Sequence, residues 1–312
     1  MPPIEPFQSP VRVAVAPVSG RHDSLVAAVE AAGALVVEPP EADALVWADA
    51  QRADLVPEVL ASAPGVRWVQ LPFAGIENFV PHLDPSLTWT CGKGVYADPV
   101  AEHALALALA GMRHLGEYAR QDSWTGPAGH NLLGARVVIL GGGEITQALL
   151  GLLAPFGATT TVVRRRPDPV PGADHTVGPD RLLDVVPDAD LVVLALALTP
   201  ETEGIIDAVA LDAMAPHSWL VNVARGRHVV TDDLVDALSA GRIGGAALDV
   251  TDPEPLPEGH PLWALPQVII TPHTANTPEM GVPLLAARVT ENVRRFAAGE
   301  TLLGPVHLDL GY

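Results

Sequence analysis

The chain has 312 residues, of which 48% are hydrophobic and 18% charged, a composition typical of a water-soluble globular protein with two domains. Its formal net charge of −19 at pH 7 argues against nucleic acid and anionic membranes as partners, because both are negatively charged. Lys93 is the only lysine, so arginine must supply most of the positive charge that attracts an anionic ligand.

The sequence also bears on the cellular compartment. A single cysteine, Cys91, excludes an internal disulfide and suits a reducing environment. The first residues lack the basic and apolar segments of a signal peptide. The longest apolar stretch, 104–110, is far shorter than the ~20 residues that span a bilayer. We therefore expect a cytoplasmic protein.

Short β-rich runs alternate with helical segments over the first hundred residues. Strands are expected at 11–15, 34–37, 44–47 and 67–70, and a helix should run from Asp23 or Ser24 to about Ala32. Proline and glycine separate these elements. Such alternation predicts a parallel sheet covered by helices.

A long helix is expected from Pro99 to about Leu115, with proline in its first turn. Its apolar residues surround the helix axis instead of forming one stripe, so the helix should be buried on all sides. Two alternatives stay open: it lies in the core of one chain, or it contacts a second copy in a homodimer.

A second α/β region begins with a strand at 136–140. Further strands are expected at 160–163, 191–195, 219–223, 246–250 and 268–270. These runs are hydrophobic without alternation, as expected for strands buried on both faces. A last helix, 283–298, should return to the first domain.

A glycine-rich turn at 141–146 follows the strand that ends at Leu140. In this context Gly141 permits a tight turn, and Gly143 allows the backbone to approach a pyrophosphate. The helix that starts at Glu144 and Ile145 offers its unpaired N–H groups to the same anion. Thr146 stands where glycine or alanine is usual, and we expect it to push the helix slightly off the strand, which weakens dinucleotide binding unless the helix spacing adjusts.

The residues after the second strand of this region indicate which dinucleotide binds. An NAD site places an acidic residue there, on the ribose hydroxyls. Here the strand runs into Arg164, Arg165 and Arg166, and no carboxylate occurs before Asp168. Guanidinium groups can hold a 2′-phosphate through charge-assisted hydrogen bonds. We therefore expect NADP in preference to NAD.

Three polar residues follow later strands of this region. Arg225 comes after the strand at 219–223, Glu254 lies in the loop after 246–250, and His273 comes after 268–270. The carboxyl ends of parallel strands are where such sheets bind ligands. An arginine can bind an anionic oxo acid, a histidine can transfer a proton, and a carboxylate can orient that histidine. With a dinucleotide site, this set indicates reversible hydride transfer.

These segments resemble the D-isomer-specific 2-hydroxyacid dehydrogenases. The resemblance is carried by 141–145, 198–202, 222–226, 247–250, 254–256 and 271–275, and in the first domain by 68–70, 74–76, 94–96 and 100–102. Departures are Thr146, Arg164 where an acid is usual, and Ala197 where a proline is usual. None of these departures is at one of the three candidate catalytic residues.

The resemblance implies an α/β fold of two doubly wound parallel-sheet domains, with a Rossmann-type coenzyme domain (98–284) inserted into a flavodoxin-like substrate domain (1–97 and 285–312). It also implies roles for the site. Arg225 would bind the substrate carboxylate and polarise the 2-oxo group. His273 would exchange a proton with that oxygen, and Glu254 would orient the imidazole and favour its charged form.

The remaining predicted contacts fall into two groups. Backbone N–H groups near Ala74 and Gly75, with Lys93 as a further cation, would bind the substrate anion. Besides the glycine turn and the arginines, the cofactor contacts would include Ala197, Thr202, Val223, Ala224, Asp249, His273 and Ala275. For Asp249, a purely structural role is an equal alternative. No metal is expected.

The expected activity is therefore reduction of a small anionic 2-oxo acid such as glyoxylate or hydroxypyruvate to a D-2-hydroxy acid. Phosphoglycerate oxidation would need more cations than the first domain supplies, and formate oxidation would not need the Glu254–His273 pair. A Rossmann methyltransferase would need neither Arg225 nor His273. The alternative of another class is a corepressor-like protein that senses dinucleotide without significant turnover.

Overall fold

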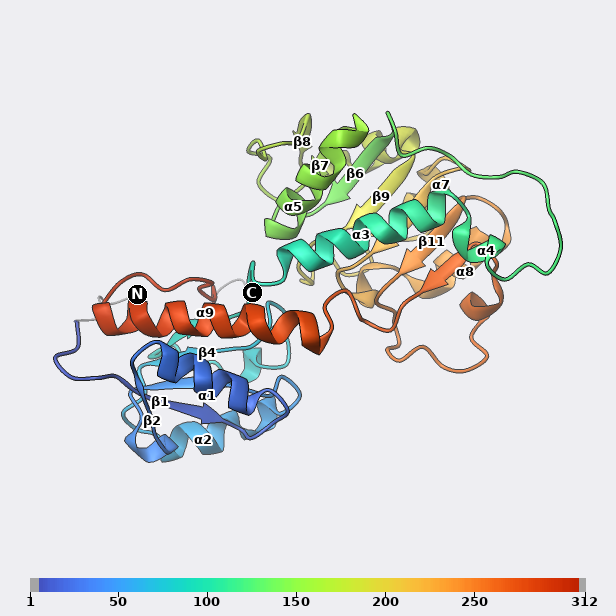
Figure 1. Ribbon diagram of the computed structural model, residues 1–312. Coiled ribbons are helices and arrows are strands. Elements are labelled where there is room, and N and C mark those ends of the chain that lie inside the picture. The colour runs from blue at the N-terminus through green and yellow to red at the C-terminus, as the bar shows by residue number, and fades with distance from the viewer. Residues whose placement is uncertain (1–5, 309–312) are drawn as a thin grey trace. The chain divides into compact units, whose positions relative to one another are not determined.

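The computed structural model describes residues 6–308, which divide into two compact units. One unit contains the chain up to Tyr96 together with the chain from Thr277 onward, and the other spans Ala97–Asn276. Figure 1 shows a parallel sheet with covering helices in each unit. The expected α/β fold with two parallel-sheet domains is confirmed.

The first unit has a five-stranded sheet in the order β2-β1-β3-β4-β5, which is the flavodoxin-like order. Its strands are β1 (Arg12–Ala16), β2 (Leu35–Val36), β3 (Ala44–Trp47), β4 (Trp68–Gln70) and β5 (Thr88–Thr90). Its α-helices are α1 (His22–Ala31), α2 (Val56–Ser62) and α9 (Pro278–Ala298). Helix α9 packs against α1 and buries Val289, Val293 and Phe296.

The second unit has a seven-stranded parallel sheet in the order β12-β11-β10-β9-β6-β7-β8. Counted from β6, this is the Rossmann order with one further strand at the β12 edge. The strands are β6 (Arg136–Leu140), β7 (Thr159–Val163), β8 (His175–Val177), β9 (Leu191–Leu194), β10 (Trp219–Asn222), β11 (Gly245–Leu248) and β12 (Val268–Ile270). Its α-helices are α3 (Ala97–Met112), α4 (Leu115–Tyr118), α5 (Glu144–Leu153), α6 (Leu182–Val185), α7 (Ala208–Ala213) and α8 (Thr231–Ser239).

The long helix α3 ends three residues earlier than expected, at Met112. His114 has a left-handed backbone with φ of 53°, which an α-helix cannot continue through. The helix packs closely on the sheet, because a Cβ at Gly111 would lie only 2.3 Å from the Trp219 ring. Ala104 and Ala108 are buried in the same core, whereas Glu102 is exposed.

Helix α9 begins five residues before the expected start at 283. Two prolines compete for the first-turn position, and Pro278 takes it, with Thr277 as the N-cap residue. Pro283 then lies inside the helix, where one backbone hydrogen bond is lost. The chain from Thr277 onward therefore enters the first unit as one continuous helix.

Candidate active site

Three neighbouring strands of the second unit end at the candidate catalytic residues. Strand β10 pairs with β11, and β11 pairs with β12, all in parallel. The loops that follow these strands therefore leave the sheet at the same edge. They carry Arg225, Glu254 and His273 respectively.

His273 and Glu254 form a direct pair. The imidazole Nδ1 lies 2.7 Å from Glu254 Oε1, and both side chains are about half exposed. Because an ionised carboxylate only accepts hydrogen bonds, this contact places a proton on Nδ1 and directs Nε2 away from Glu254. The remaining ring nitrogen can then exchange a proton with a ligand.

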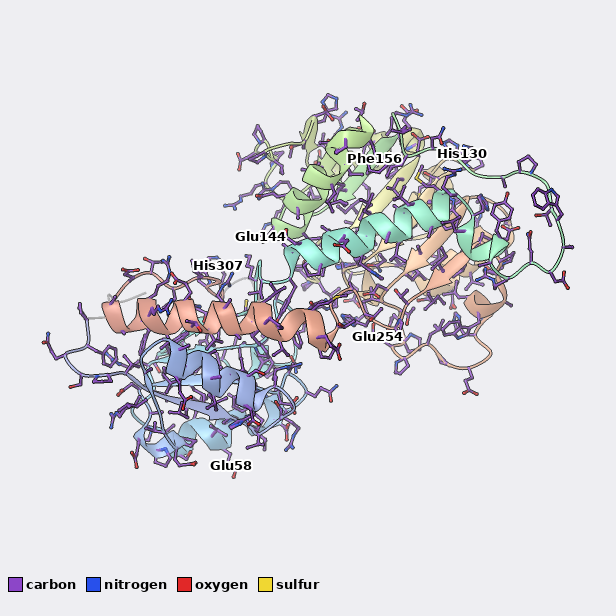
Figure 2. All side chains as sticks on the ribbon, viewed as in Figure 1. Glu58, His130, Glu144, Phe156, Glu254 and His307 are labelled. Atoms are coloured by element: carbon purple, nitrogen blue, oxygen red, sulfur yellow. The ribbon has the colours of Figure 1, made fainter. Side chains whose placement is uncertain are left out.

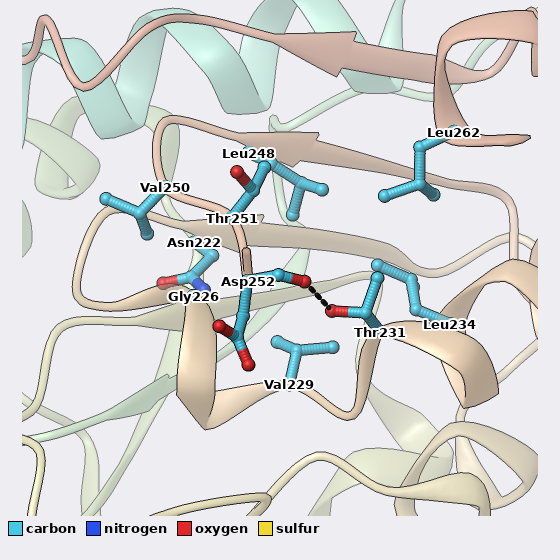
Figure 3. A pocket seen from close by; sticks show the side chains of 10 residues that line it. All are labelled: Asn222, Gly226, Val229, Thr231, Leu234, Leu248, Val250, Thr251, Asp252 and Leu262. Carbon is cyan, nitrogen blue, oxygen red and sulfur yellow. Dashed lines mark hydrogen bonds between the residues drawn. The ribbon is translucent and has the colours of Figure 1, made fainter. Parts of the chain in front are cut away.

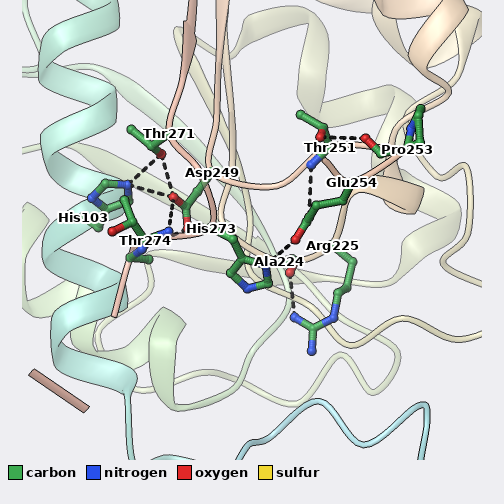
Figure 4. Close-up of polar contacts among 11 residues, drawn as sticks. His103, Ala224, Arg225, Asp249, Thr251, Pro253, Glu254, Thr271, His273 and Thr274 are labelled. Carbon is green, nitrogen blue, oxygen red and sulfur yellow. Dashed lines mark hydrogen bonds and ion pairs between the residues drawn. The ribbon is translucent and has the colours of Figure 1, made fainter. Parts of the chain in front are cut away.

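Arg225 is held by the turn that follows β10. Its Nη1 donates to the carbonyl oxygen of Ala224 at 2.8 Å. The buried side chain of Asn222 closes the turn, since its Nδ2 donates to Arg225 O at 2.8 Å and its Oδ1 accepts from Ala224 N at 3.0 Å. Figure 4 shows Arg225 in one close-up with Glu254 and His273. Asn222 was not predicted, although it is the only polar residue in the run 219–223.

The loop that carries Arg225 packs directly on the loop that carries Glu254. A Cβ at Gly226 would lie 2.0 Å from the carbonyl carbon and oxygen of Thr251, so only glycine fits this contact. Thr231 adds a hydrogen bond from Oγ1 to Asp252 O at 2.7 Å. Figure 3 shows the side chains that line a small recess at these loops. The space open to water inside it is about 10 Å³. It holds one water at most, so it is a packing defect and not a ligand pocket.

The carboxylate of Asp249, at the end of β11, is buried and is used within the unit. Thr271 Oγ1 donates to Oδ1 at 2.6 Å, and the amides of Thr274 and Ala275 donate at 2.9 and 3.0 Å. Burial opposes ionisation of Asp249, but hydrogen bonds from His103, Thr271 and these amides outweigh it and lower its pKa to about 2. The carboxylate thus fixes the loop on both sides of His273. Its contact with a cofactor stays a prediction, as do those of Val223 and Ala224.

The glycine turn has the geometry that a dinucleotide site requires. Gly141 has φ of 107°, and a Cβ there would lie 2.1 Å from Ala195 O, so no other residue fits. A Cβ at Gly143 would meet nothing within 4 Å, which leaves the backbone open to a ligand. Helix α5 starts at Glu144, which Figure 2 labels, and Ile145 follows in its first turn. No side chain forms a capping hydrogen bond at the N-terminus of this helix. These residues fit a pyrophosphate at the helix N-terminus.

Thr146 forms a bond that the sequence pattern did not predict. Its side chain is fully buried, and Oγ1 donates to the carbonyl oxygen of Gly141 at 2.9 Å. The hydroxyl therefore ties the first turn of α5 to the glycine turn. The expected loss of dinucleotide affinity stays a prediction.

Two of the three arginines after β7 have neighbours in the dinucleotide region. The side chain of Arg164 lies over the glycine turn, since a Cβ at Gly142 would be 2.9 Å from Arg164 Cδ and 3.1 Å from Nε. A hydrogen bond from Thr199 lowers the pKa of Glu201, and the positive charge of Arg165 lowers it further. The positive charge of Arg165 thus acts on the loop after β9.

The loop after β9 is closed by its own residues. Thr202 Oγ1 donates to Ala197 O at 2.8 Å and accepts from Thr199 N at 2.8 Å. Buried His228 adds two contacts to the same loop, with Nδ1 3.0 Å from Thr202 O and Nε2 3.2 Å from Leu196 O. Nothing in the sequence pattern distinguished His228 from the other histidines.

In the first unit, the predicted anion-binding segment follows β4. The amides of Ala74 and Gly75 donate to no backbone carbonyl among residues 6–308. Tyr96 OH donates to Pro72 O at 2.7 Å, and burial raises the pKa of that phenol. The Arg21 guanidinium lies 5.0 Å from the centre of the neighbouring Phe73 ring.

Lys93 lies in a more cationic part of the first unit than the sequence indicated. Its carbonyl oxygen accepts from Arg288 Nη1 at 3.0 Å. Arg288 makes this bond and Arg21 lies over the Phe73 ring, so two guanidinium groups lie near this segment. Neither arginine was predicted, because they are far apart in the sequence.

Within residues 6–308, no group of three or more His, Cys, Asp or Glu side chains is arranged to hold a metal ion. No helix in the same range is long and apolar enough to cross a membrane.

Comparison with known proteins gives consistent matches. Residues 104–275 match the family model for the NAD binding domain of D-isomer specific 2-hydroxyacid dehydrogenases. An uncharacterized protein in the proB 3′ region of Corynebacterium melassecola is 42% identical over 264 residues, which are 82% of this chain and 87% of that protein. Glyoxylate/hydroxypyruvate reductase A of Photorhabdus laumondii is 31% identical over 284 residues, 86% of this chain and 87% of the relative.

Among solved structures, a D-isomer specific 2-hydroxyacid dehydrogenase from Xanthobacter autotrophicus, in complex with NADPH and MES, is similar to this chain with a TM-score of 0.85. The two sequences are 27% identical, and the match covers 97% of this chain and 100% of the other.

Proposed function

The chain belongs to the D-isomer specific 2-hydroxyacid dehydrogenase family, and from this premise we propose that it reduces a small 2-oxo acid to the D-2-hydroxy acid with a hydride from a nicotinamide dinucleotide. The observation that carries the proposal is the His273–Glu254 pair, at 2.7 Å, on the sheet edge that also presents Arg225. The relative from Photorhabdus laumondii, named a glyoxylate/hydroxypyruvate reductase, favours these two acids as substrates.

Each catalytic residue has one task in this reaction. Arg225 binds the carboxylate of the oxo acid and withdraws charge from the oxo group as it becomes an alkoxide. His273 gives the proton on Nε2 to that oxygen, while Nδ1 stays bonded to Glu254. The nicotinamide, when bound, supplies the hydride that reaches C2 of the acid. Reduction therefore consumes one hydride and one proton, and oxidation returns both.

We propose NADP as the preferred dinucleotide. The support is local: the Arg164 side chain lies beside the glycine turn, and the charge of Arg165 acts on Glu201 in the loop after β9. Their guanidinium groups suit the extra phosphate on the adenosine ribose. The similar structure from Xanthobacter autotrophicus contains NADPH, which agrees with this choice.

We further propose that the first unit contributes to binding of the substrate anion. The amides of Ala74 and Gly75, with the cationic surroundings of Lys93, supply hydrogen-bond donors in an otherwise acidic chain. The arginines nearby supply more cations than the sequence indicated, so a phosphorylated oxo acid belongs in the substrate test.

We also propose a homodimer. Trp124 is fully exposed, and Leu115 and Leu133 are more than half exposed, all on the segment that follows α3. Apolar side chains of this size are usually covered in the assembled state. Sedimentation equilibrium on the wild type and on Trp124→Ser tests this: a dimer that the substitution weakens supports it, and a wild-type monomer at micromolar concentration contradicts it.

The deciding experiment is a substrate panel assayed with NADPH and with NADH. It includes glyoxylate, hydroxypyruvate, pyruvate and phosphohydroxypyruvate, with formate oxidation as an additional arm. We expect turnover of the small oxo acids and production of the D-enantiomer where the product is chiral. Tight dinucleotide binding without turnover of any acid would favour a sensing protein instead.

A further inference from the structure

A buried hydrogen-bond network lies behind the loop that carries His273. At its centre is Asp249, which is 2% exposed and accepts bonds from Thr271 Oγ1 and from the amides of Thr274 and Ala275. Figure 4 shows these bonds on the side of the loop away from Glu254. The carboxylate therefore holds residues on both sides of His273 in the sequence.

The backbone of Asp249 holds His273 itself. His273 N donates to Asp249 O at 2.8 Å. His273 also has φ of 51°, a left-handed conformation that residues with a side chain seldom adopt. Such a conformation is unfavourable and persists only where the surroundings enforce it. The bonds to Asp249 are the surroundings that do so here.

His103 closes the network from helix α3. Its Nε2 lies 3.1 Å from Thr271 Oγ1 and 3.3 Å from Asp249 Oδ1. The hydroxyl proton of Thr271 goes to Asp249, so the hydroxyl oxygen accepts from His103 Nε2–H. One N–H of His103 thus serves both acceptors. Since α3 packs on β10 and β11, the network anchors the His273 loop to the core of the unit.

We propose that His103, Asp249 and Thr271 are positioning residues for proton transfer by His273. They hold His273 in the left-handed conformation that sets Nδ1 against Glu254 and leaves Nε2 for the substrate oxygen. The inference rests on the proposed function and deepens it, because it assigns the alignment of the proton donor to a helix that contributes no catalytic group. It also gives Asp249 a task other than contact with the cofactor.

The test combines His103→Leu and Thr271→Val with Thr271→Ser as the conservative rescue. Loss of alignment should lower kcat about 10- to 100-fold in the first two variants, with the Kd for NADPH unchanged. Thr271→Ser keeps the hydroxyl and should stay near the wild-type kcat. Asp249→Asn should resemble His103→Leu; a raised Kd for NADPH with an unchanged kcat would instead assign Asp249 to the cofactor and overturn the proposal.

The matched control is His217→Leu. His217 Nε2 lies 2.8 Å from Asp190 Oδ1, so it is also a part-buried histidine paired with an aspartate in the same unit. Both residues precede strands, so they lie at the amino-terminal ends of the strands, whereas His273 follows the carboxyl end of β12. This variant should lose thermal stability but keep kcat. Equal kcat losses in His217→Leu and His103→Leu would show a general structural effect and overturn the proposal.

A readout without cofactor separates this inference from the proposed function. The imidazole ¹⁵N resonances of His273, assigned with His273→Ala, report its proton on Nδ1 in the free protein. They should change in His103→Leu and Thr271→Val and stay unchanged in His217→Leu. A wild type without turnover contradicts the proposed function, whereas unchanged resonances and kcat in both variants contradict the positioning alone.

Discussion

His273 Nδ1 and Glu254 Oε1 lie 2.7 Å apart, although the two residues come from loops after different strands. This pairing fixes which imidazole nitrogen can reach a substrate. His273→Ala should therefore lower kcat by about 10²–10⁴-fold, the usual contribution of general acid–base catalysis. The Kd for NADPH, measured by fluorescence, should stay constant. Glu254→Gln keeps a hydrogen-bond acceptor but removes the charge, so its kcat should fall less than that of His273→Ala. A kcat equal to wild type in His273→Ala would exclude the proton-transfer role.

Arg225→Lys tests whether a planar guanidinium is needed. Lysine keeps the positive charge but cannot bind a carboxylate through two parallel N–H groups. The side chain also loses the bond from Nη1 to Ala224 O that orients it. We expect a higher KM for the oxo acid and a lower kcat, with Arg225→Ala worse in both. Steady-state kinetics with saturating NADPH measures both KM and kcat. The control is Arg227→Lys, at an exposed residue that is paired with Glu203.

Gly226→Ala tests the contact between the two loops that carry Arg225 and Glu254. The added Cβ would lie 2.0 Å from Thr251 backbone atoms, which cannot move as a flexible side chain could. Overpacking of this kind costs about 1–3 kcal/mol. We expect a lower urea midpoint and reduced kcat together. Gly151→Ala is the control: its Cβ would meet nothing within 4 Å inside α5, so it should stabilise the protein by about 0.5–1 kcal/mol.

The buried strands could be predicted because hydrophobic runs such as 136–140 leave no other interpretation. The strands β5 and β8 were missed, since each is a three-residue edge strand without the hydrophobic run that identifies β12. The same limit applies to β2, which keeps two of the four residues expected. Short edge strands depend on pairing with a neighbour, which a local pattern does not contain.

Some residues of the candidate site could likewise be predicted from the sequence, and others could not. Arg225 and His273 could be predicted as candidates because each lies three residues after a hydrophobic strand. His103 could not, because its partners Asp249 and Thr271 are more than 140 residues away in the sequence. The start of α9 had no decisive local signal either, because Pro278 and Pro283 both suit a first turn and the Thr277 side chain makes no capping bond. Tertiary packing supplied what the local sequence did not.

Arg164→Asp tests the choice of dinucleotide. The guanidinium beside Gly142 is the group that we expect to meet the 2′-phosphate, and a carboxylate there would repel it and favour ribose hydroxyls. The ratio of kcat/KM for NADPH to that for NADH should fall by about tenfold or more, given the ~1.5–3 kcal/mol of a charged hydrogen bond. Arg166→Asp is the control from the same loop. An unchanged ratio in Arg164→Asp, with kcat intact, would place the 2′-phosphate elsewhere.

Asp249 should make the stability of the second unit depend on pH. Its pKa is about 2 in the folded chain and 3.8 as the ordinary value, so the unfolded chain binds the proton first as the pH falls. The ionised carboxylate therefore contributes about 2 kcal/mol of stability above pH 5, and this contribution disappears as the pH falls toward 2. Other carboxylates titrate equally in wild type and in Asp249→Asn, so they cancel in the difference between the two.

Urea unfolding of both proteins between pH 6 and pH 3 measures that difference. Asp249→Asn should be less stable than wild type at pH 6. The gap between the two free energies of unfolding should narrow steadily toward pH 3. Asp188→Asn, on a side chain that is 78% exposed, should show a small gap at every pH. A gap for Asp249→Asn that stays constant over this range would mean that Asp249 binds its proton equally well in the folded and unfolded chains, contrary to the hydrogen bonds that hold it.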